Sequence, residues 1–598
     1  MHLLGALLVA ALLGTPVAQE SRGSLGVYRM PDDLARELGV DLGAGVLHVV
    51  SRSPADKAGV ETGDAIVAVN GERVADFDEM ATKLRESKSG ETISLDVRRG
   101  SEVRRVKATL VRRAAEMNDA GYQKTLDKLN SIKPRHDGPA RAREIAEAEW
   151  HLGRRADALK TADAAAARFT RDPSLAERRL EYLLKNGRLA EYVQHGLELG
   201  KQPQRSASLR LHYLEALLAS GRNSEAERET MVVMDAAVRE RQPTDDFVRA
   251  YHAWIEARLR QGKSLTERAV DGYLADVSMA PGADQRRVMS MAAWRDLLAG
   301  APTYQRRSSK TAKADVQYHL TGLLFGLIPD RMNGITIQVN GVEVPLAIVD
   351  TGAAHTLIHD SIAEKAKIDS DDVRRGAHGS LNFTAKSGLV RELRIGDVVL
   401  HNIPVSIGDP PPLVMTKAKA ALGVDLMHHL QFTIDYINKR VTAVPADAVD
   451  DKPESADRVW DIPLFPFSEH TLAEGTLDSG ARARVLIDSG NFAQTLIWPT
   501  WGQANISGHP GPSKGLFEFA ASNPMHKIRG LSLGGKRLPD WPGMDMPPVT
   551  LQGVDLIDLL MGHDLLSQYV VTIDMRNRRL RLRSPDGPVK PPVAQKGL

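Results

Sequence analysis

Two segments in the second half of the chain look like copies of one another, and each carries an aspartate. The first covers residues 347–353 (AIVDTGA) and the second covers residues 485–491 (VLIDSGN). In both, an apolar stretch leads to Asp, then a hydroxyl residue, then Gly. A later apolar stretch with a glycine follows 73 residues after the first aspartate, at Gly423, and 74 residues after the second, at Gly562. A duplicated lobe that supplies one aspartate per copy is what a carboxylate pair at a two-fold axis requires.

The two aspartates, Asp350 and Asp488, are therefore the candidate catalytic residues. Two carboxylates a few ångströms apart cannot both ionise easily, so they share one proton and titrate as a pair. The ionised member can take a proton from a water molecule while the other donates to a carbonyl oxygen. The pattern predicts a peptide-bond hydrolase that uses neither a cofactor nor a metal. Which aspartate carries the shared proton stays open.

A second Asp-Ser-Gly triplet begins at Asp478, but its position excludes it from this pair. It stands 138 residues after Asn340, the start of an Asn-Gly turn, and Asp488 stands 138 residues after Asp350. Asp478 is therefore expected in a hairpin turn. His355 and His359 have the spacing of a zinc-binding helix, but no Glu follows the first His, so no metal site is predicted there.

Residues 320–582 resemble a retropepsin-type aspartic protease with two fused lobes, similar in plan to the pepsins. The paired Asp-Thr/Ser-Gly motifs and their downstream glycines carry the resemblance. The family implies that the hydroxyl residues bond across the two loops and that the glycines allow tight turns. It also implies a second element that threads behind each catalytic loop. The implied supports of the dyad are Thr351, Gly352, Ser489, Gly490, Gly423 and Gly562.

The family closes a glycine-rich hairpin flap over its substrate. The candidate flap in the first copy is Gly376-Ala377-His378-Gly379, and residues 508–512 take the similar place in the second. One departure concerns the residue after each motif, which is usually Ala, Ser or Thr in the family. The first copy has Ala353, whereas the second has Asn491. Retention of Asp488 and its neighbours in the second copy argues for activity over a structural remnant.

Residues 21–113 have a β-rich pattern punctuated by glycine, including the turn Asn70-Gly71. This stretch resembles a PDZ domain of the kind found in HtrA-type proteases. The resemblance places a peptide-carboxylate loop at Ser24-Leu25-Gly26-Val27. Domains of this family bind a peptide end as an added strand, with backbone N–H groups holding the carboxylate. A packing module that binds no peptide is the alternative.

Residues 115–304 are rich in Ala, Leu, Glu and Arg, and their apolar residues have helical spacing. Similar turns recur 34 residues apart at Gly153, Gly187 and Gly221. This period resembles tetratricopeptide repeats, although the full consensus is absent, so the segment is described as TPR-like. Such a stack is expected either to hold a protein partner on its concave face or to act as a helical spacer.

The bulk composition excludes several functions. The chain has 598 residues and a formal charge of +2, and no run of one sign points to nucleic acid. It has no cysteine, which excludes disulfides, thiol nucleophiles and a lipid anchor on Cys. Residues 1–18 resemble a secretory signal peptide cleaved near Ala18, so export to the periplasm or the medium is expected. No transmembrane segment is predicted.

The expected fold class is therefore multidomain: an α+β PDZ domain, an all-α TPR-like array and an all-β, bilobal, retropepsin-like double barrel. The expected function is an exported aspartic-type endopeptidase that acts on polypeptides. The alternative is an inert peptide-binding or scaffold protein that keeps a protease fold. A serine protease is a poorer alternative, because no chymotrypsin-like serine motif accompanies the PDZ pattern. The expected bounds are signal peptide 1–18, PDZ domain 21–113, helices 115–304, linker 305–314, lobes 315–448 and 449–585, and tail 586–598.

Overall fold

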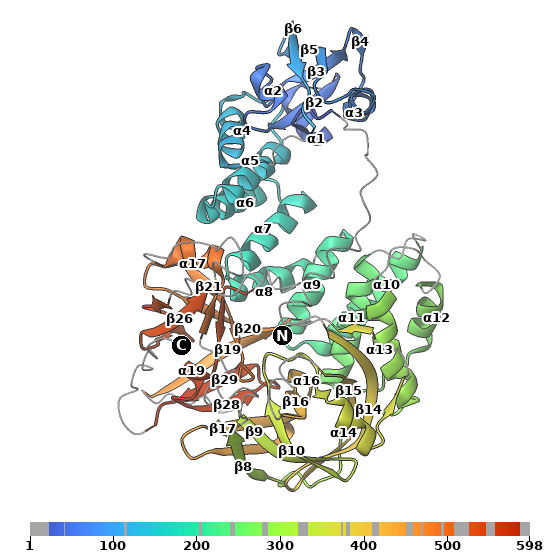
Figure 1. Ribbon diagram of the computed structural model, residues 1–598, viewed down its shortest axis with the longest axis vertical. Coiled ribbons are helices and arrows are strands. Elements are labelled where there is room, and N and C mark those ends of the chain that lie inside the picture. The colour runs from blue at the N-terminus through green and yellow to red at the C-terminus, as the bar shows by residue number, and fades with distance from the viewer. Residues whose placement is uncertain are drawn as a thin grey trace, which may run out of the picture. The chain divides into compact units, whose positions relative to one another are not determined.

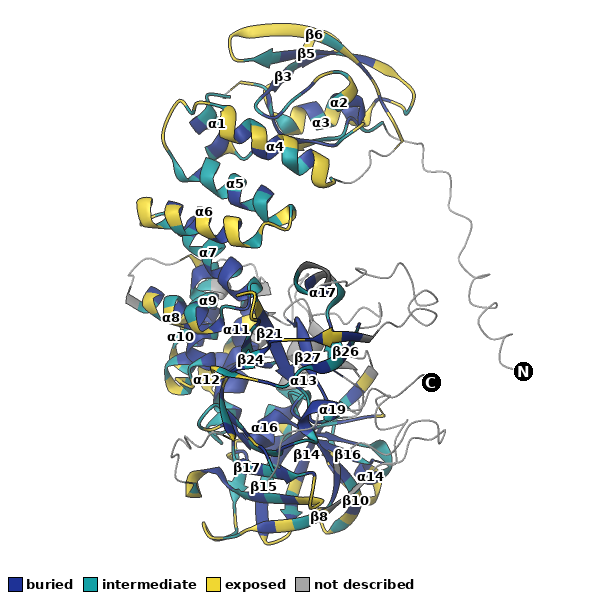
Figure 2. Cartoon of the chain, turned by 90° about the vertical axis from the view of Figure 1, so that its left-hand side faces the viewer, coloured by how far each residue is buried: buried dark blue, intermediate teal, exposed yellow. Residues whose placement is uncertain are grey.

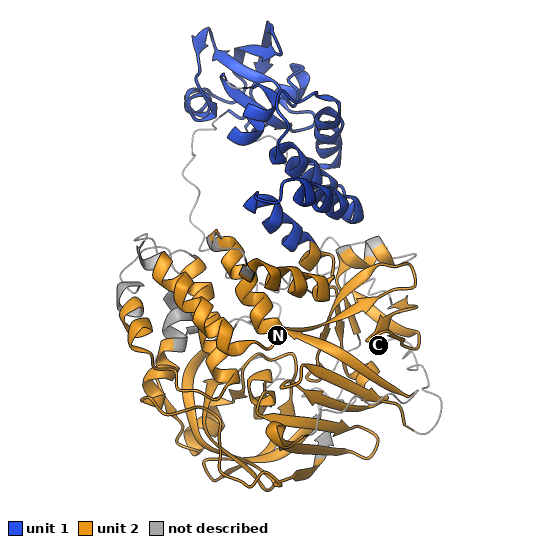
Figure 3. Ribbon diagram, turned by 180° about the vertical axis from the view of Figure 1, so that it is seen from behind, with its two compact units in different colours: residues 1–182 blue, residues 183–598 orange. Residues whose placement is uncertain are grey.

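The structure is a computed structural model, and the chain divides into two compact units, Met1–Tyr182 and Leu183–Leu598 (Figure 3). This division falls within the segment that the sequence predicts as one helical array. The expected signal peptide lies outside the described residues. Those residues are 23–40, 42–112, 117–201, 206–239, 245–277, 285–320, 333–371, 375–377, 383–409, 418–449, 458–467, 470–491, 495–506, 525–545 and 557–585.

The first unit begins with a PDZ-like sheet of six strands in the order β1-β2-β3-β5-β6, with β4 paired to β3. Asn70 and Gly71 form the predicted turn between β3 and β4, with φ of 52° and 85°. Apolar residues such as Val46, Ile66 and Leu95 alternate into a common core. The elements are β1 Val27–Arg29, α1 Asp32–Leu38, β2 Ala44–Val49, α2 Pro54–Lys57, β3 Ala65–Val69, β4 Glu72–Arg73, α3 Phe77–Arg85, β5 Thr92–Arg99 and β6 Glu102–Thr109.

Helices follow. The three glycines of the 34-residue period lie in the turns directly after α5, α7 and α9. Gly153, Gly187 and Gly221 all have a left-handed backbone, with φ of 72°, 70° and 74°. Only glycine adopts this conformation without strain, which explains why the sequence repeats it. The helices are α4 Asp119–Ser131, α5 Pro139–His151, α6 Arg155–Arg168, α7 Pro173–Lys185, α8 Leu189–Glu198, η1 Leu199–Lys201, α9 Ala207–Ala219, α10 Asn223–Arg239, α11 Asp245–Arg260, α12 Arg268–Val277 and α13 Gln285–Leu298.

The C-terminal strands belong to a closed barrel, and several of them are labelled in Figure 1. Residues 305–314, expected as a linker, include β7, which pairs with β15. The elements of the first copy and its entry are β7 Gln305–Arg306, β8 Ala314–Leu320, β9 Asn333–Val339, β10 Val342–Val349, β11 Leu357–Ile358, α14 Asp360–Lys365, β12 Asp369–Ser370, β13 Arg375–Ala377, β14 Phe383–Ile395, β15 Val398–Ile407, β16 Ala420–Leu422, α16 Val424–Met427, β17 Leu430–Asp435, β18 Arg440–Pro445 and η2 Ala446–Ala448.

The second copy repeats the strand pairing of the first. β10 pairs in parallel with β16, as β21 does with β27, and β11 pairs antiparallel with β16, as β22 does with β27. Asp478 lies in a turn before β21, as predicted. The elements are β19 Val459–Pro466, β20 Thr471–Thr476, β21 Arg482–Ile487, β22 Thr495–Ile497, α17 Pro499–Asn505, β23 Met525–Ile528, β24 Ser532–Leu533, β25 Lys536–Arg537, β26 Trp541–Asp545, β27 Leu559–Met561, α19 His563–Leu566, β28 Val570–Asp574 and β29 Arg579–Arg583.

A six-stranded sheet joins the two copies in the order β8-β18-β17-β28-β29-β19. At its centre, β17 and β28 run antiparallel, with Thr433 opposite Thr572. The two threonine hydroxyls lie 3.0 Å apart. Because β17 and β28 are matching strands of the two copies, the sheet is built around a local two-fold axis.

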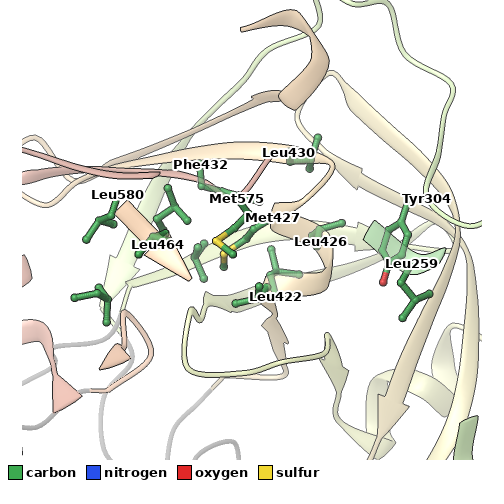
Figure 4. Packing of buried hydrophobic residues seen from close by; sticks show 14 of the residues in the cluster. Leu259, Tyr304, Leu422, Leu426, Met427, Leu430, Phe432, Leu464, Met575 and Leu580 are labelled. Atoms are coloured by element: carbon green, nitrogen blue, oxygen red, sulfur yellow. The ribbon is translucent and has the colours of Figure 1, made fainter. Parts of the chain in front are cut away.

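Helices of the second unit share a core with this sheet. Figure 2 shows buried residues, in dark blue, along the barrel strands. Leu259 of α11 and Tyr304 lie close to Leu426 of α16 within one cluster of buried residues (Figure 4). The Tyr304 hydroxyl donates a hydrogen bond to Asp425 Oδ2 at 2.7 Å. The helical segment therefore supports the first copy directly.

Candidate active site

Asp350 and Asp488 each follow directly after a buried strand, at the ends of β10 and β21. Each aspartate is held from behind by a parallel strand. The N–H of Asp350 donates to the carbonyl of Leu422 at 3.0 Å, and the N–H of Asp488 donates to the carbonyl of Met561 at 2.9 Å. The two copies therefore present their aspartates through the same backbone geometry.

The structure brings the two carboxyl groups together, within hydrogen-bonding reach of each other. Each also accepts the N–H two residues further on. Gly352 donates to Asp350 Oδ1 at 2.8 Å, and Gly490 donates to Asp488 Oδ1 at 3.0 Å. These bonds orient both carboxyl groups toward the local two-fold axis.

The two glycines of the motifs face the carboxyl group of the opposite copy. A Cβ atom on Gly352 would lie 2.6 Å from Asp488 Cγ, and one on Gly490 would lie 2.3 Å from Asp350 Cγ. Such contacts are far inside the van der Waals limit. The need for glycine here is therefore close approach, in addition to the tight turn that the sequence suggests.

The hydroxyl residues of the motifs bond across the axis. Ser489 Oγ accepts the N–H of Thr351 at 3.1 Å, and Thr351 Oγ1 accepts the N–H of Ser489 at 2.9 Å. The same hydroxyls donate to carbonyls of the opposite strand ends, at 2.6 Å to Ile487 and 2.7 Å to Val349. Both side chains are buried, so four satisfied hydrogen bonds lock the loops together.

Burial raises the pKa of both carboxyl groups, because a low-dielectric site disfavours their charged forms. The pKa of Asp488 rises well above its ordinary value, since the charge and hydrogen bond of Asp350 act in the same direction. For Asp350, N–H donors at Gly352 and the bond from Asp488 offset part of the effect of burial on its pKa. The pair is therefore set to hold one proton between two oxygens.

Two buried aspartates that the sequence analysis did not single out support the loops from below. Thr356 Oγ1 donates to Asp425 Oδ1 at 2.9 Å, and Thr495 Oγ1 donates to Asp564 Oδ1 at 3.1 Å. Threonine and aspartate are 69 residues apart in both copies, so a comparison of the two copies could have identified these residues from the sequence. Gly423 is also restricted, because a Cβ there would lie 2.5 Å from the carbonyl carbon of His355.

Asn491 takes the same backbone position as Ala353. Its carbonyl accepts the N–H of His563 at 3.0 Å, as the carbonyl of Ala353 accepts the N–H of Val424 at 2.9 Å. Gly562 comes just before α19, as Gly423 comes before α16. The polar side chain therefore leaves the turn of the second copy unchanged.

The remaining predicted site residues lie elsewhere. Gly376 and Ala377 lie in β13, which pairs with β14 to form a hairpin, whereas His378, Gly379 and residues 508–512 lie outside the described residues. In the first unit, Ser24 pairs with Val111, Leu25 is buried, Gly26 has a φ of 80°, and Val27 begins β1. β1 is an edge strand of its sheet.

Comparison with protein families identifies two segments. The PDZ domain family matches residues 15–110, and the family described as aspartyl protease matches residues 335–426, within the first copy. These matches confirm the resemblance to a PDZ domain and to an aspartyl protease domain. The TPR-like and retropepsin-like assignments stay predictions.

Curated relatives match a smaller share of the chain. A probable periplasmic serine endoprotease, DegP-like, from Brucella suis is 34% identical over 131 residues, which are 20% of this chain and 26% of the relative. A probable periplasmic serine protease, do/HhoA-like, from Haemophilus influenzae is 36% identical over 96 residues, 15% of this chain and 21% of the relative. The chain thus spans about a quarter of the length of the curated relatives it matches.

A solved structure, the HtrA-type protease AlgW with a decapeptide, is 27% identical over 16% of this chain and 30% of that chain, with a TM-score of 0.15. None of the helices in the described segments offers an apolar span that would reach across a bilayer.

These relatives contradict the enzyme class expected from the sequence. The expectation was an aspartic-type endopeptidase, whereas the relatives carry the names of serine proteases. The names support a hydrolase that cleaves proteins but do not support the aspartic type. The segment shared with this relative covers only 20% of the chain, and the Asp350–Asp488 pair was predicted from other considerations, the duplicated motifs.

Proposed function

We propose that this chain is a protease and that its C-terminal half hydrolyses peptide bonds with water activated between Asp350 and Asp488. The observation that carries the proposal is the meeting of these two half-buried carboxyl groups beside the reciprocal bonds of Thr351 and Ser489. A like-charge pair that is largely removed from water costs folding free energy, and sites that keep one are commonly functional.

The chemistry follows from one shared proton. The ionised carboxylate takes a proton from the water as its oxygen attacks the scissile carbonyl carbon, and the protonated carboxyl donates to the carbonyl oxygen. Proton return to the leaving nitrogen then breaks the C–N bond. The residues supply both acid and base, so no further group is required for proton balance.

The finer architecture is part of the same proposal. The repeated pairing of β10 with β16 and of β21 with β27 supports a bilobal, retropepsin-like plan. The helices α4–α13 are proposed as a TPR-like array, and Tyr304, which follows the last of these helices, contacts the first lobe through Asp425. The domain bounds expected from the sequence are retained as proposals.

The PDZ segment is proposed to bind polypeptide ends. Its edge strand β1 lies beside α3, and Arg29 of β1 contacts Asp78 of α3 at 3.1 Å. A strand and a helix at a sheet edge form the setting in which a peptide adds as a further strand. Because the relatives have names that place them in the periplasm, export to that compartment is proposed for this chain as well.

A serine mechanism, as named for the relatives, has one arrangement to consider. Ser361 Oγ lies 2.9 Å from His359 Nδ1, and His359 Nε2 lies 3.3 Å from Asp409 Oδ1. The same Nδ1 accepts the backbone N–H of Ser361 at 3.1 Å, and Lys419 Nζ lies 3.1 Å from Nε2. This is the N-cap of α14, whose acceptor is already engaged, so the carboxylate pair is the better candidate.

The deciding experiment measures cleavage of an unfolded protein across pH by the full chain and four variants. Asp350→Asn and Asp488→Asn should each lower kcat/KM by about 100-fold or more, the usual contribution of a general acid or base. Asp478→Asn is the matched control, because it changes an Asp-Ser-Gly triplet in an exposed turn. Ser361→Ala tests the serine arrangement.

The outcomes separate three functions. Loss in the two dyad variants alone supports water activation by the carboxylates. Loss in Ser361→Ala alone would transfer the activity to a serine nucleophile. Cleavage unchanged in every variant would place the activity at another site and contradict the proposal, and absence of cleavage from the wild type would favour the peptide-binding scaffold.

A further inference from the structure

A cluster of three ligand-type side chains, two buried and one partly buried, lies where the helical segment meets the first catalytic loop. His252 and Glu256 come from α11, and His355 comes from the loop five residues after Asp350. Within the described segments, their ligand atoms all lie within 4.8 Å of one another. By spacing alone His355 pairs with His359, and the sequence gives no signal for this set, whose members are distant in the chain.

The helix aims two of these side chains in one direction. His252 and Glu256 are four residues apart, so they lie on the same face of α11. Glu256 Oε1 lies 3.8 Å from His252 Nε2 and 3.2 Å from His355 Nε2. Ligands held about 2.0–2.2 Å from a tetrahedral zinc ion lie roughly 3.3–3.5 Å apart, so the two separations from Glu256 are close to those of a metal site, and the two histidine nitrogens lie within 4.8 Å of each other.

The surroundings hold the three groups in place. His252 and Glu256 are buried, and the ring of His355 packs edge-on against Trp294 at 5.0 Å between centroids. Arg260 Nε lies 3.7 Å from the other oxygen of Glu256, Oε2, so Oε1 is the oxygen that lies near the two imidazoles. Arg260 also donates to the carbonyls of Pro466 and Phe467, so its position is fixed independently.

We propose that His252, Glu256 and His355 bind one divalent transition-metal ion, with zinc as the best fit. Two neutral imidazoles and one carboxylate are ligands that Zn²⁺ prefers, and a fourth position would be left for water. The ion would join α11 to the loop that carries Asp350. Its role is to anchor that loop, and it takes no part in the proton transfers of the carboxylate pair.

The test is direct binding of Co²⁺ and Zn²⁺ to the metal-stripped full chain. Wild type should bind a single ion per chain, with the visible absorption of a low-coordinate Co²⁺ site. His355→Gln and His252→Gln should each weaken binding by at least about 100-fold, since even loss of an outer partner costs 10–100-fold. His401→Gln is the matched control, because His401 also faces a carboxylate, Glu392, at 3.3 Å.

Thermal unfolding provides the second readout. Zn²⁺ should raise the Tm of wild type and of His401→Gln, and it should leave the Tm of the other two variants unchanged. Circular dichroism without metal establishes that each variant folds, and two separate histidine variants keep the test valid if one does not. No saturable binding by wild type, or binding by both histidine variants with the affinity of wild type, would overturn the proposal. Neither result bears on the carboxylate pair, because no measurement here uses proteolysis.

Discussion

Thr351 and Ser489 exchange backbone hydrogen bonds, each hydroxyl accepting the N–H of the other at 2.9–3.1 Å. The two residues are 138 positions apart and belong to different copies. Because both are buried, the bonds are shielded from water and connect the two copies at the point where the carboxyl groups meet.

This reciprocal contact should appear as energetic coupling between the copies. Thr351→Val and Ser489→Ala should each destabilise the second unit, because each leaves buried N–H and C=O groups without a partner. The double variant should lose less than the sum, with a coupling energy of about 0.5–3 kcal/mol. Denaturant unfolding of the four proteins measures it. Strict additivity would show that the bonds add nothing to lobe association.

The motif glycines should not tolerate a methyl group. Gly352→Ala and Gly490→Ala would each push a Cβ into the opposite carboxyl group, so we expect proteolysis to fall steeply even if the fold survives. Gly272→Ala is the control, because a Cβ there meets nothing within 4 Å. Cleavage rates and circular dichroism of the three variants check the prediction, and full activity in either motif variant would contradict it.

The carboxylate pair should cost stability at neutral pH. Burial raises the pKa of Asp488 above its ordinary value of 3.8, so the folded state binds more protons than the unfolded state over the interval between the two values. Stability from this group is therefore greatest below pH 3.8 and falls as pH rises through that interval. Asp488→Asn removes the buried charge and should stabilise the fold at neutral pH by about 0.5–2 kcal/mol.

The stability gain should disappear in acid, which distinguishes charge removal from a packing effect. Urea unfolding at several pH values measures it. Asp397→Asn, in an exposed turn, is the control and should change stability at no pH. A gain in Asp488→Asn that persists well below pH 3.8 would contradict this explanation.

The PDZ segment should distinguish a free peptide carboxylate from an amidated one. Charge-assisted hydrogen bonds to loop N–H groups contribute about 1.5–3 kcal/mol, so amidation should weaken binding roughly 10–100-fold. Gly26→Val should abolish binding, because Gly26 has a φ of 80°. Gly100→Val, at φ of 61° with open space around it, is the matched control. Fluorescence anisotropy with the full chain gives both affinities, and equal binding of the two peptides would contradict the prediction.

The duplicated half was the part most open to prediction, because duplication supplies an internal comparison. The equal spacing of Asp350 and Asp488 from their hairpin turns identified the meeting pair and rejected Asp478. The turn at Asn70-Gly71 and the recurrent glycines of the helices could be predicted for a different reason. Their backbone conformations select glycine or asparagine locally, so no tertiary information is needed.

What could not be predicted depends on contacts between distant parts of the chain. Nothing in the sequence pairs Glu256 with His355, since α11 meets the loop only after the helices pack on the first copy. Likewise, the bond from Tyr304 to Asp425 joins residues 121 positions apart with no repeated spacing. The expected enzyme class, an aspartic-type endopeptidase, is contradicted by the relatives, which are named serine proteases. Such a name describes a whole protein, whereas the segment shared with this chain is short.

The sheet formed by β17 and β28 has a consequence for how the active half assembles. A protein ending after the first copy would leave the edge of β17 bare, and it could complete its sheet only by recruiting a second molecule. Joining both copies in one polypeptide turns that encounter into an intramolecular step, independent of protein concentration. It also frees each half to diverge, which is how the first loop can carry Ala353 where the second carries Asn491.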